Sequence, residues 1–310
     1  MEKSPTKSKF SEQHPLLFGL FLIILAVALF MGAMAFFRSL GGKSKPLSGD
    51  KIGLCKIEGM ITDAGEVTSF LRELKQDDSV KGVLLRIDSP GGAVAPSQEL
   101  YQAVRELAAK KPVVASMGTA AASGGYYAAA PATLIVANPG TLTASIGVRA
   151  EYVNVQGLMD KLGLKSDTLA SGKLKAAGSP TQPMTPEQRA YLQGLIMDLH
   201  QQFVGDVAEA RKMPLDKVEK LADGRAMTGR QALEAGLVDK LGGQEQALAA
   251  LRELAKLPES APLLEGPEKK LPFLPRLLGA TLSALAQALL ETPGQTGLRG
   301  QDGLLLQYRQ

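Results

Sequence analysis

The chain has 310 residues, of which 45% are hydrophobic and 21% are charged, and its formal net charge at pH 7 is +4. This length fits one large domain or two small ones with appendages. Basic and acidic residues alternate without a long basic run, which argues against nucleic-acid binding. A single cysteine excludes an internal disulfide, and no Cys/His cluster has zinc-ligand spacing, so neither a metal nor another cofactor is indicated.

The N-terminal residues predict a membrane anchor. Residues 1–14 are polar, whereas 15–37 form an uncharged run of 23 residues, enough for a helix to cross a hydrocarbon core of about 30 Å. A cleaved secretory signal is the competing interpretation, but its apolar region is usually shorter, about 7–15 residues. Lysines and arginines flank the run on both sides, so charge alone does not set its orientation.

Residues 38–50 predict a linker, after which apolar runs and amphipathic segments alternate. Strands are expected at 52–59, 80–88, 112–118 and 132–138, with helices at 66–76 and 96–111. Repeated β-α-β units imply parallel strands with helical crossovers, and hence an α/β domain over 51–257. Cys55 lies in the first strand, which predicts a buried, inert thiol.

The second half of the chain is predicted to be mainly helical and to end in a tail. A helix is expected to begin at Thr185, because a Thr cap is followed by proline. Further helical patterns extend to about 257. Residues 258–310 are predicted to form a Pro-rich C-terminal tail with a helix at 276–291.

The motif RIDSPGG (86–92) ends a predicted strand in two glycines. In open α/β folds, ligands bind at the carboxyl ends of parallel strands. Gly91 and Gly92 allow the backbone to approach a ligand closely, and either N–H could donate to an oxyanion. A tight strand-to-helix turn is the simpler interpretation of the motif alone.

Ser123 lies in AAASGGYYAAA (120–130), a stretch that predicts the start of a helix. A hydroxyl at a helix N-terminus has free amides beside it, which favours developing negative charge. The N–H of Gly124 is then the natural oxyanion donor. The alternative is that small residues serve close packing and Ser123 only caps the helix, and the tyrosines at 126 and 127 are interpreted as helix packing.

A nucleophilic serine needs a base. His14 precedes the apolar run and His200 lies within a predicted helix, so neither histidine fits a Ser-His-Asp triad. A lysine base must instead be neutral near pH 7, which burial promotes by lowering the amine pKa from about 10.4. Lys173 and Lys175 lie in ASGKLKAAGSP (170–180), a small-residue loop without an acid. This loop is the best place in the chain for a buried amine.

Five motifs in order resemble the signal peptide peptidase A family: DSPGG, AASGGYYAA, TASIGV (143–148), SGKLKAAGSP and ADGRAMTGRQALEAGLVDKLGG (222–243). This family comprises membrane-bound serine proteases of the Clp-protease/crotonase fold. The resemblance implies Ser123 as nucleophile, Lys175 as general base, Ser145 as a serine that orients the lysine, and Gly91, Gly92 and Gly124 at the oxyanion hole. Leu174 stands where the family has an aromatic residue, which leaves Lys173 as a minor candidate.

The resemblance also implies a setting for the enzyme. It predicts a single-pass protein of the cell inner (plasma) membrane, with the catalytic domain on the extracytoplasmic side and a homo-oligomeric ring as its assembly. Its substrates would be apolar peptides such as signal-peptide remnants. Soluble Clp proteases use a histidine about 25 residues after the serine, where this chain has SIGVRA. The alternatives are a related protease acting on a stomatin-like partner, a crotonase-type acyl-CoA enzyme, and a catalytically silent scaffold.

Overall fold

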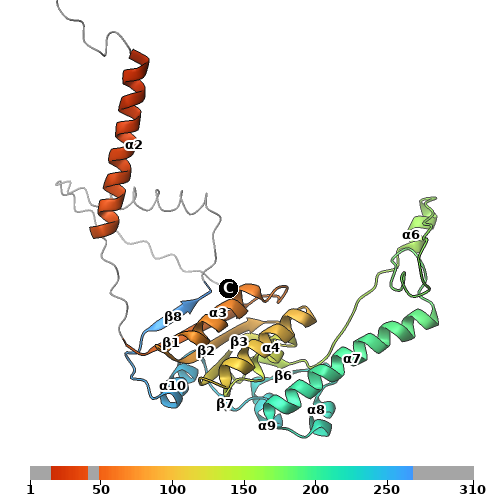
Figure 1. Cartoon of the computed structure of the whole chain (residues 1–310). Helices are drawn as coiled ribbons and strands as arrows, with labels where there is room; N and C mark the ends of the chain where they lie inside the picture. The colour runs from red at the N-terminus through yellow and green to blue at the C-terminus, as the bar shows by residue number, and fades with distance from the viewer. Residues whose placement is uncertain (1–14, 41–48, 268–310) are drawn as a thin grey trace, which may run out of the picture. The chain divides into compact units, whose positions relative to one another are not determined.

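The computed structural model describes residues 15–40 and 49–267 (Figure 1). The helices described are α2 (Pro15–Leu40), α3 (Gly65–Gln76), α4 (Val94–Ala108), α5 (Gly124–Ala129), α6 (Gln156–Lys161), α7 (Pro186–Arg211), α8 (Leu215–Leu221), α9 (Gly229–Ala235) and α10 (Gln244–Ala255). The strands are β1 (Lys51–Glu58), β2 (Val80–Ser89), β3 (Val113–Ala122), β4 (Leu134–Ala137), β5 (Leu142–Ala144), β6 (Ala226–Thr228), β7 (Lys240–Leu241) and β8 (Leu263–Gly266).

These strands form one eight-stranded sheet, with the order β6-β5-β3-β2-β1-β8 and with β4 and β7 branching from β3. Every pairing is parallel except that of β5 with β6. Strand β3 divides the sheet, because Val114–Met117 pair with β4 while Ala120–Ala122 pair with β5. The predicted mixed α/β architecture with parallel crossovers is confirmed.

Helices cover both faces of the sheet (Figure 1). Alternate strand residues point to opposite faces, and those of the larger core pack against α3, α4, α5 and the C-terminal half of α7. On the other face, Ile52, Leu54 and Leu84 pack with Leu248 and Leu251 of α10. Burial of these side chains on both faces explains why the strands are nearly continuous apolar runs.

The sequence predicted the first strands and helices within a few residues, with two differences. Strand β3 continues to Ala122, four residues beyond its expected end at 118. Three alanines there pair with β5, so the stretch expected to open a helix is half strand, and the helix begins at Gly124. In addition, β8 pairs with β1, so the sheet includes residues beyond the predicted domain end at 257.

Helix α7 begins as expected. The Thr185 hydroxyl accepts a hydrogen bond from the N–H of Gln188, and the Gln188 side chain accepts one from the N–H of Thr185. This reciprocal capping box, with proline in the first turn, satisfies donors that the helix itself leaves free. The cap fixes where the loop that carries Lys173 and Lys175 joins the helix.

Helix α2 covers the predicted anchor segment at 15–37. Within the part of the chain that the structure describes, no helix is long and apolar enough to cross a membrane. The membrane anchor at 15–37 therefore stays a prediction. The N-terminal tail at 1–14, most of the linker and the helix expected at 276–291 lie outside the described residues.

Cys55 is fully buried in β1. Burial raises the pKa of its thiol to about 12, so the thiol stays protonated at neutral pH. The prediction of a buried, inert cysteine is confirmed.

Candidate active site

Ser123 lies between the end of β3 and the first residue of α5. Its backbone has φ 52° and ψ −120°, a conformation that non-glycine residues seldom adopt. Its N–H donates to the carbonyl of Ala144 on β5, at 2.8 Å, and its carbonyl accepts from the N–H of Tyr127, at 2.9 Å. Its side chain makes no capping hydrogen bond. A simple capping role for Ser123 is therefore not what the structure shows, and its hydroxyl is left available for chemistry.

The DSPGG loop packs directly against Ser123. A Cβ built on Gly91 would lie 2.9 Å from Cβ of Ser123 and 2.7 Å from the amide nitrogen of Gly124. One built on Gly92 would lie 2.0 Å from the carbonyl oxygen of Ile61. Gly91 also has φ +97°, which strains any residue with a side chain. Both positions require glycine, Gly91 because the backbone around Ser123 lies close to it and Gly92 because the backbone of Ile61, after β1, lies close to it.

The N–H groups of the two candidate donors, Gly91 and Gly92, differ in their hydrogen bonding. The N–H of Gly91 donates to the hydroxyl of Ser89, at 3.1 Å. No hydrogen bond among the described residues uses the N–H of Gly92 or of Gly124. A Cβ on Gly124 would lie 3.3 Å from the nitrogen of Gly92. Gly92 and Gly124 are therefore the pair of neighbouring amides free to donate to a developing oxyanion.

Ser145 belongs to a second strained segment, which lies beside Ser123. Ala144 and Ser145 have φ 60° and 52°, and the carbonyl of Ala144 holds the N–H of Ser123. The N–H of Ser145 donates to the carbonyl of Arg225, and its hydroxyl donates to the carbonyl of Gly224, at 3.3 Å. The loop after α8 thus fixes the backbone at Ser145.

Lys173 and Lys175 are exposed, and nothing described joins either of them to Ser123 within one chain. They belong to residues 147–202, which we call the arm and which contain no buried residue. Figure 1 shows α6 near the start of α7, where the Val155 N–H donates to the carbonyl of Pro180, at 2.7 Å. The expected buried amine is absent from the described single chain, because the small residues around it project outward instead of packing inward.

The arm nevertheless places Lys175 in a groove of about 720 Å³. The groove is bounded by the loop at 171–177 and by Glu187, Tyr191, Leu192 and Leu195 of α7. Several arm residues expose large apolar side chains, including Val153 at 71%, Leu162 at 65% and Leu169 at 97%. An exposed apolar surface of this kind is typical of a contact with another molecule.

Among the described residues, no hydrogen bond joins the Ser123 hydroxyl to a candidate base. His200 lies in the middle of α7, and its Nδ1 atom is buried without a hydrogen-bond partner in the described chain. No group of His, Cys, Asp and Glu in that part of the chain could hold a metal ion.

Two features of the site were missed at the sequence level. Asp88 of the DSPGG motif accepts a hydrogen bond from the N–H of Ala120, at 3.1 Å, and so holds the end of β3 that leads to Ser123. Tyr127 is more than packing, because its hydroxyl donates to the carboxylate of Asp206 on α7. Both partners lie far away in the chain, and periodicity gives no signal for such pairs.

Comparison with known proteins identifies the family. The model of Peptidase family S49 matches residues 105–258, and that of Clp protease matches 55–138. A putative protease of Methanocaldococcus jannaschii is 39% identical over 254 residues, which are 77% of this chain and 82% of that protein. The chain belongs to peptidase family S49. A putative protease of Synechocystis sp. is 41% identical over 231 residues, or 74% of this chain and 83% of that protein.

Within family S49, this chain is a serine protease of the signal peptide peptidase A group. A putative signal peptide peptidase SppA of Enterococcus faecium is 38% identical over 229 residues, or 69% of this chain and 66% of that protein. Among solved structures, a ClpP1 mutant from Listeria monocytogenes matches 63% of this chain and 94% of its own, with 15% identity and a TM-score of 0.43. The protease relatives do not favour an acyl-CoA enzyme or a silent scaffold.

Proposed function

We propose that this S49 protease is a membrane-anchored endopeptidase that uses Ser123 as nucleophile and Lys175 as general base. One observation carries the proposal: Ser123 has a strained backbone, and its hydroxyl, which makes no capping hydrogen bond, lies beside the free amides of Gly92 and Gly124. Strained residues of this kind persist where the surrounding structure imposes them for function. The absence of a histidine or another base next to Ser123, among the residues described, makes lysine the candidate proton acceptor.

The proposed reaction begins when the neutral amine of Lys175 takes the proton of the Ser123 hydroxyl. Oγ then attacks the peptide carbonyl carbon, and the N–H groups of Gly92 and Gly124 hold the resulting oxyanion. Collapse of this intermediate breaks the peptide bond, and the lysine returns the proton to the leaving amine. Water, deprotonated by the same amine, hydrolyses the acyl-enzyme and regenerates Ser123.

A second copy of the chain is proposed to supply Lys175. The lysine and the nucleophile do not meet within one chain, and the arm that carries Lys175 buries no residue of its own. The arm's exposed apolar side chains would be covered if it lay on a neighbouring copy. That contact would also remove water from the amine, which favours its neutral form. A closed ring follows if each copy gives its arm to the next.

The proposed substrates are apolar peptides at the membrane, such as signal-peptide remnants. One relative is named as a signal peptide peptidase, and the apolar segment at 15–37 would tether the protease where such peptides are released. The catalytic domain is proposed to lie on the extracytoplasmic side of the inner (plasma) membrane. No observation favours a protease directed at a stomatin-like partner.

A serine-directed phosphonate probe tests the proposal. The full-length protein should be labelled at Ser123, as located by mass spectrometry of the digested adduct, and Ser123→Ala should not be labelled. Lys175→Ala should be labelled at least about a hundredfold more slowly, because the hydroxyl then has no base. Labelling of Lys175→Ala at the wild-type rate would contradict the assignment of the base.

A further inference from the structure

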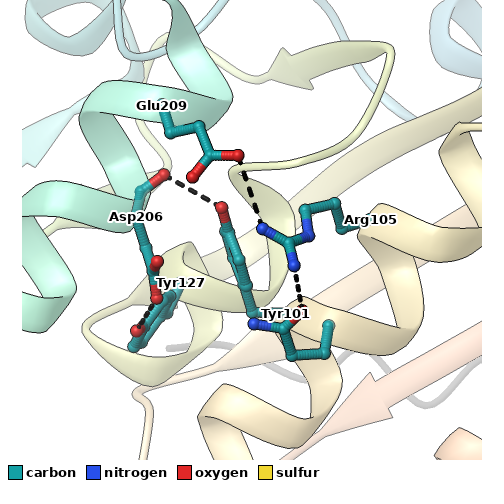
Figure 2. Close-up of polar contacts among 6 residues, drawn as sticks. Tyr101, Arg105, Tyr127, Asp206 and Glu209 are labelled. Carbon is teal, nitrogen blue, oxygen red and sulfur yellow. Dashed lines mark hydrogen bonds and ion pairs between the residues drawn. The ribbon is translucent and has the colours of Figure 1, made fainter.

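Tyr127 connects the helix that begins after the nucleophile with the helix that carries the arm. Figure 2 shows its hydroxyl directed at the carboxylate of Asp206 on α7, to which it donates a hydrogen bond. Its ring stacks on Phe203, one turn earlier on α7, with ring centroids 4.2 Å apart and planes 16° apart. Tyr127 is 2% exposed, so it contacts no substrate directly.

On the nucleophile side, the connection is one helical turn long. The N–H of Tyr127 donates to the carbonyl of Ser123, at 2.9 Å. Tyr127 therefore bonds to the strained backbone at Ser123 through its N–H and contacts α7 through its side chain. Burial and the neighbouring carboxylate of Asp206 raise the pKa of the Tyr127 phenol, so its hydroxyl stays protonated and can donate at neutral pH.

On the arm side, α7 is packed against the domain at one end only. The helix has 26 residues and is therefore about 39 Å long. Its buried residues, Phe203, Val204, Val207 and Ala208, lie in its C-terminal half. The N-terminal half buries nothing within the chain and leads back to the loop with Lys175. A small rotation at the buried half would be magnified at the loop.

We propose that Tyr127 is a positioning residue: it fixes the angle of α7 relative to Ser123 and thereby sets where the arm delivers its lysine. This inference rests on the proposed role of Lys175 as the base. It assigns Tyr127 an effect on the rate of the chemical step, because a displaced base lowers the fraction of productive encounters.

Other contacts keep α7 attached when this connection is removed. From α4, the Tyr101 hydroxyl donates to the backbone carbonyl of Asp206 at 3.1 Å, and Arg105 pairs with Glu209 at 3.4 Å (Figure 2). Gln98 also donates to Gln202, at 2.9 Å. Replacing Tyr127 by phenylalanine keeps the ring stack and removes only the hydroxyl. The variant is therefore expected to fold.

The test compares Tyr127→Phe with Tyr126→Phe in the full-length protein. Tyr126 is equally buried on the same helix, but its hydroxyl donates to the carbonyl of Leu237, at 3.0 Å, and not to α7. We expect Tyr127→Phe to lower kcat on an apolar peptide about tenfold with KM nearly unchanged, while Tyr126→Phe keeps the wild-type kcat. A purely structural role would lower Tm and activity alike in both variants.

Asp206 provides the rescue. Asp206→Asn keeps an acceptor oxygen for the Tyr127 hydroxyl and should retain kcat within about twofold, whereas Asp206→Leu should match Tyr127→Phe. Equal activity of all these variants and the wild type would overturn the proposal, as would equal loss in Tyr126→Phe and Tyr127→Phe.

A second readout does not depend on activity. Spin labels at Leu169→Cys in the arm and Lys110→Cys, just after α4, report the distance between arm and domain, with labelled protein diluted into unlabelled protein. Cys55 is buried and should not react. Tyr127→Phe should broaden the distance distribution and Tyr126→Phe should not; an unchanged distribution in Tyr127→Phe would overturn the inference. This readout holds even if Ser123 and Lys175 prove not to act as proposed.

Discussion

Ser123→Ala is expected to lower kcat for hydrolysis of an apolar peptide by at least about 10³-fold, because it removes the hydroxyl proposed to form the acyl-enzyme. The oxyanion amides of Gly92 and Gly124 would remain, so a small residual rate over water should persist. The measurement is steady-state hydrolysis of a fluorogenic peptide by the purified full-length protein. The melting temperature should change little, since the Ser123 side chain makes no capping hydrogen bond.

The matched control for this variant is Ser79→Ala. Ser79 lies just before β2, at the opposite end of the strand from DSPGG, and its hydroxyl bonds only to Asp77 among the described residues. It should keep the wild-type kcat. Retention of more than about a tenth of the activity by Ser123→Ala would mean that the protease uses another nucleophile.

Lys175→Ala is expected to lower kcat by a similar factor, about 10³-fold, because a serine and its base act as a unit. Lys175→Arg should be equally inactive, since a guanidinium keeps its charge and cannot accept the serine proton. Both variants should still bind the peptide, and their kcat values are measured in the same hydrolysis assay.

Lys173→Ala controls for charge. It removes the same charge two residues away, in a side chain that is also exposed, and should keep most of the activity. If Lys173→Ala were inactive and Lys175→Ala active, the base would be Lys173. The absence of the family's aromatic residue at Leu174 would then mean that the catalytic lysine lies two residues earlier in this chain than the motif alignment implies.

Much of this fold could be predicted from local sequence. The apolar runs of β1, β2 and β4 are bounded by turn residues and lie between amphipathic helices, so their period and order suffice. The glycines at 91 and 92 and the serine at 123 were also predicted as candidate site residues, because loops at the carboxyl ends of parallel strands form the sites of α/β folds. The structure adds that the N–H of Gly91 already donates to the hydroxyl of Ser89, which favours Gly92 as the proposed donor.

Other features could not be predicted because their causes are not local. The alanines at 120–122 favour a helix by intrinsic propensity, and pairing with β5 overrides that preference in favour of the strand. Strand β8 follows a Pro-rich turn and is specified by β1, more than 200 residues away in sequence. The loop around Lys175 has small residues and no acid, a composition that fits a buried segment and an outward arm alike. Only the structure, in which residues 147–202 bury no side chain, shows that this loop projects away from the domain.

Mixed assemblies test most directly whether Lys175 of one copy serves Ser123 of another. Ser123→Ala and Lys175→Ala chains, each inactive alone, are co-expressed at equal levels, and peptide hydrolysis by the co-purified assembly is measured. If each site joins a serine and a lysine from neighbouring copies, random mixing gives one intact site in four, so we expect about a quarter of the wild-type activity. If the mixture stayed as inactive as its parents while the two chains co-purified, the dyad would not form between copies, and this account of the active site would be wrong.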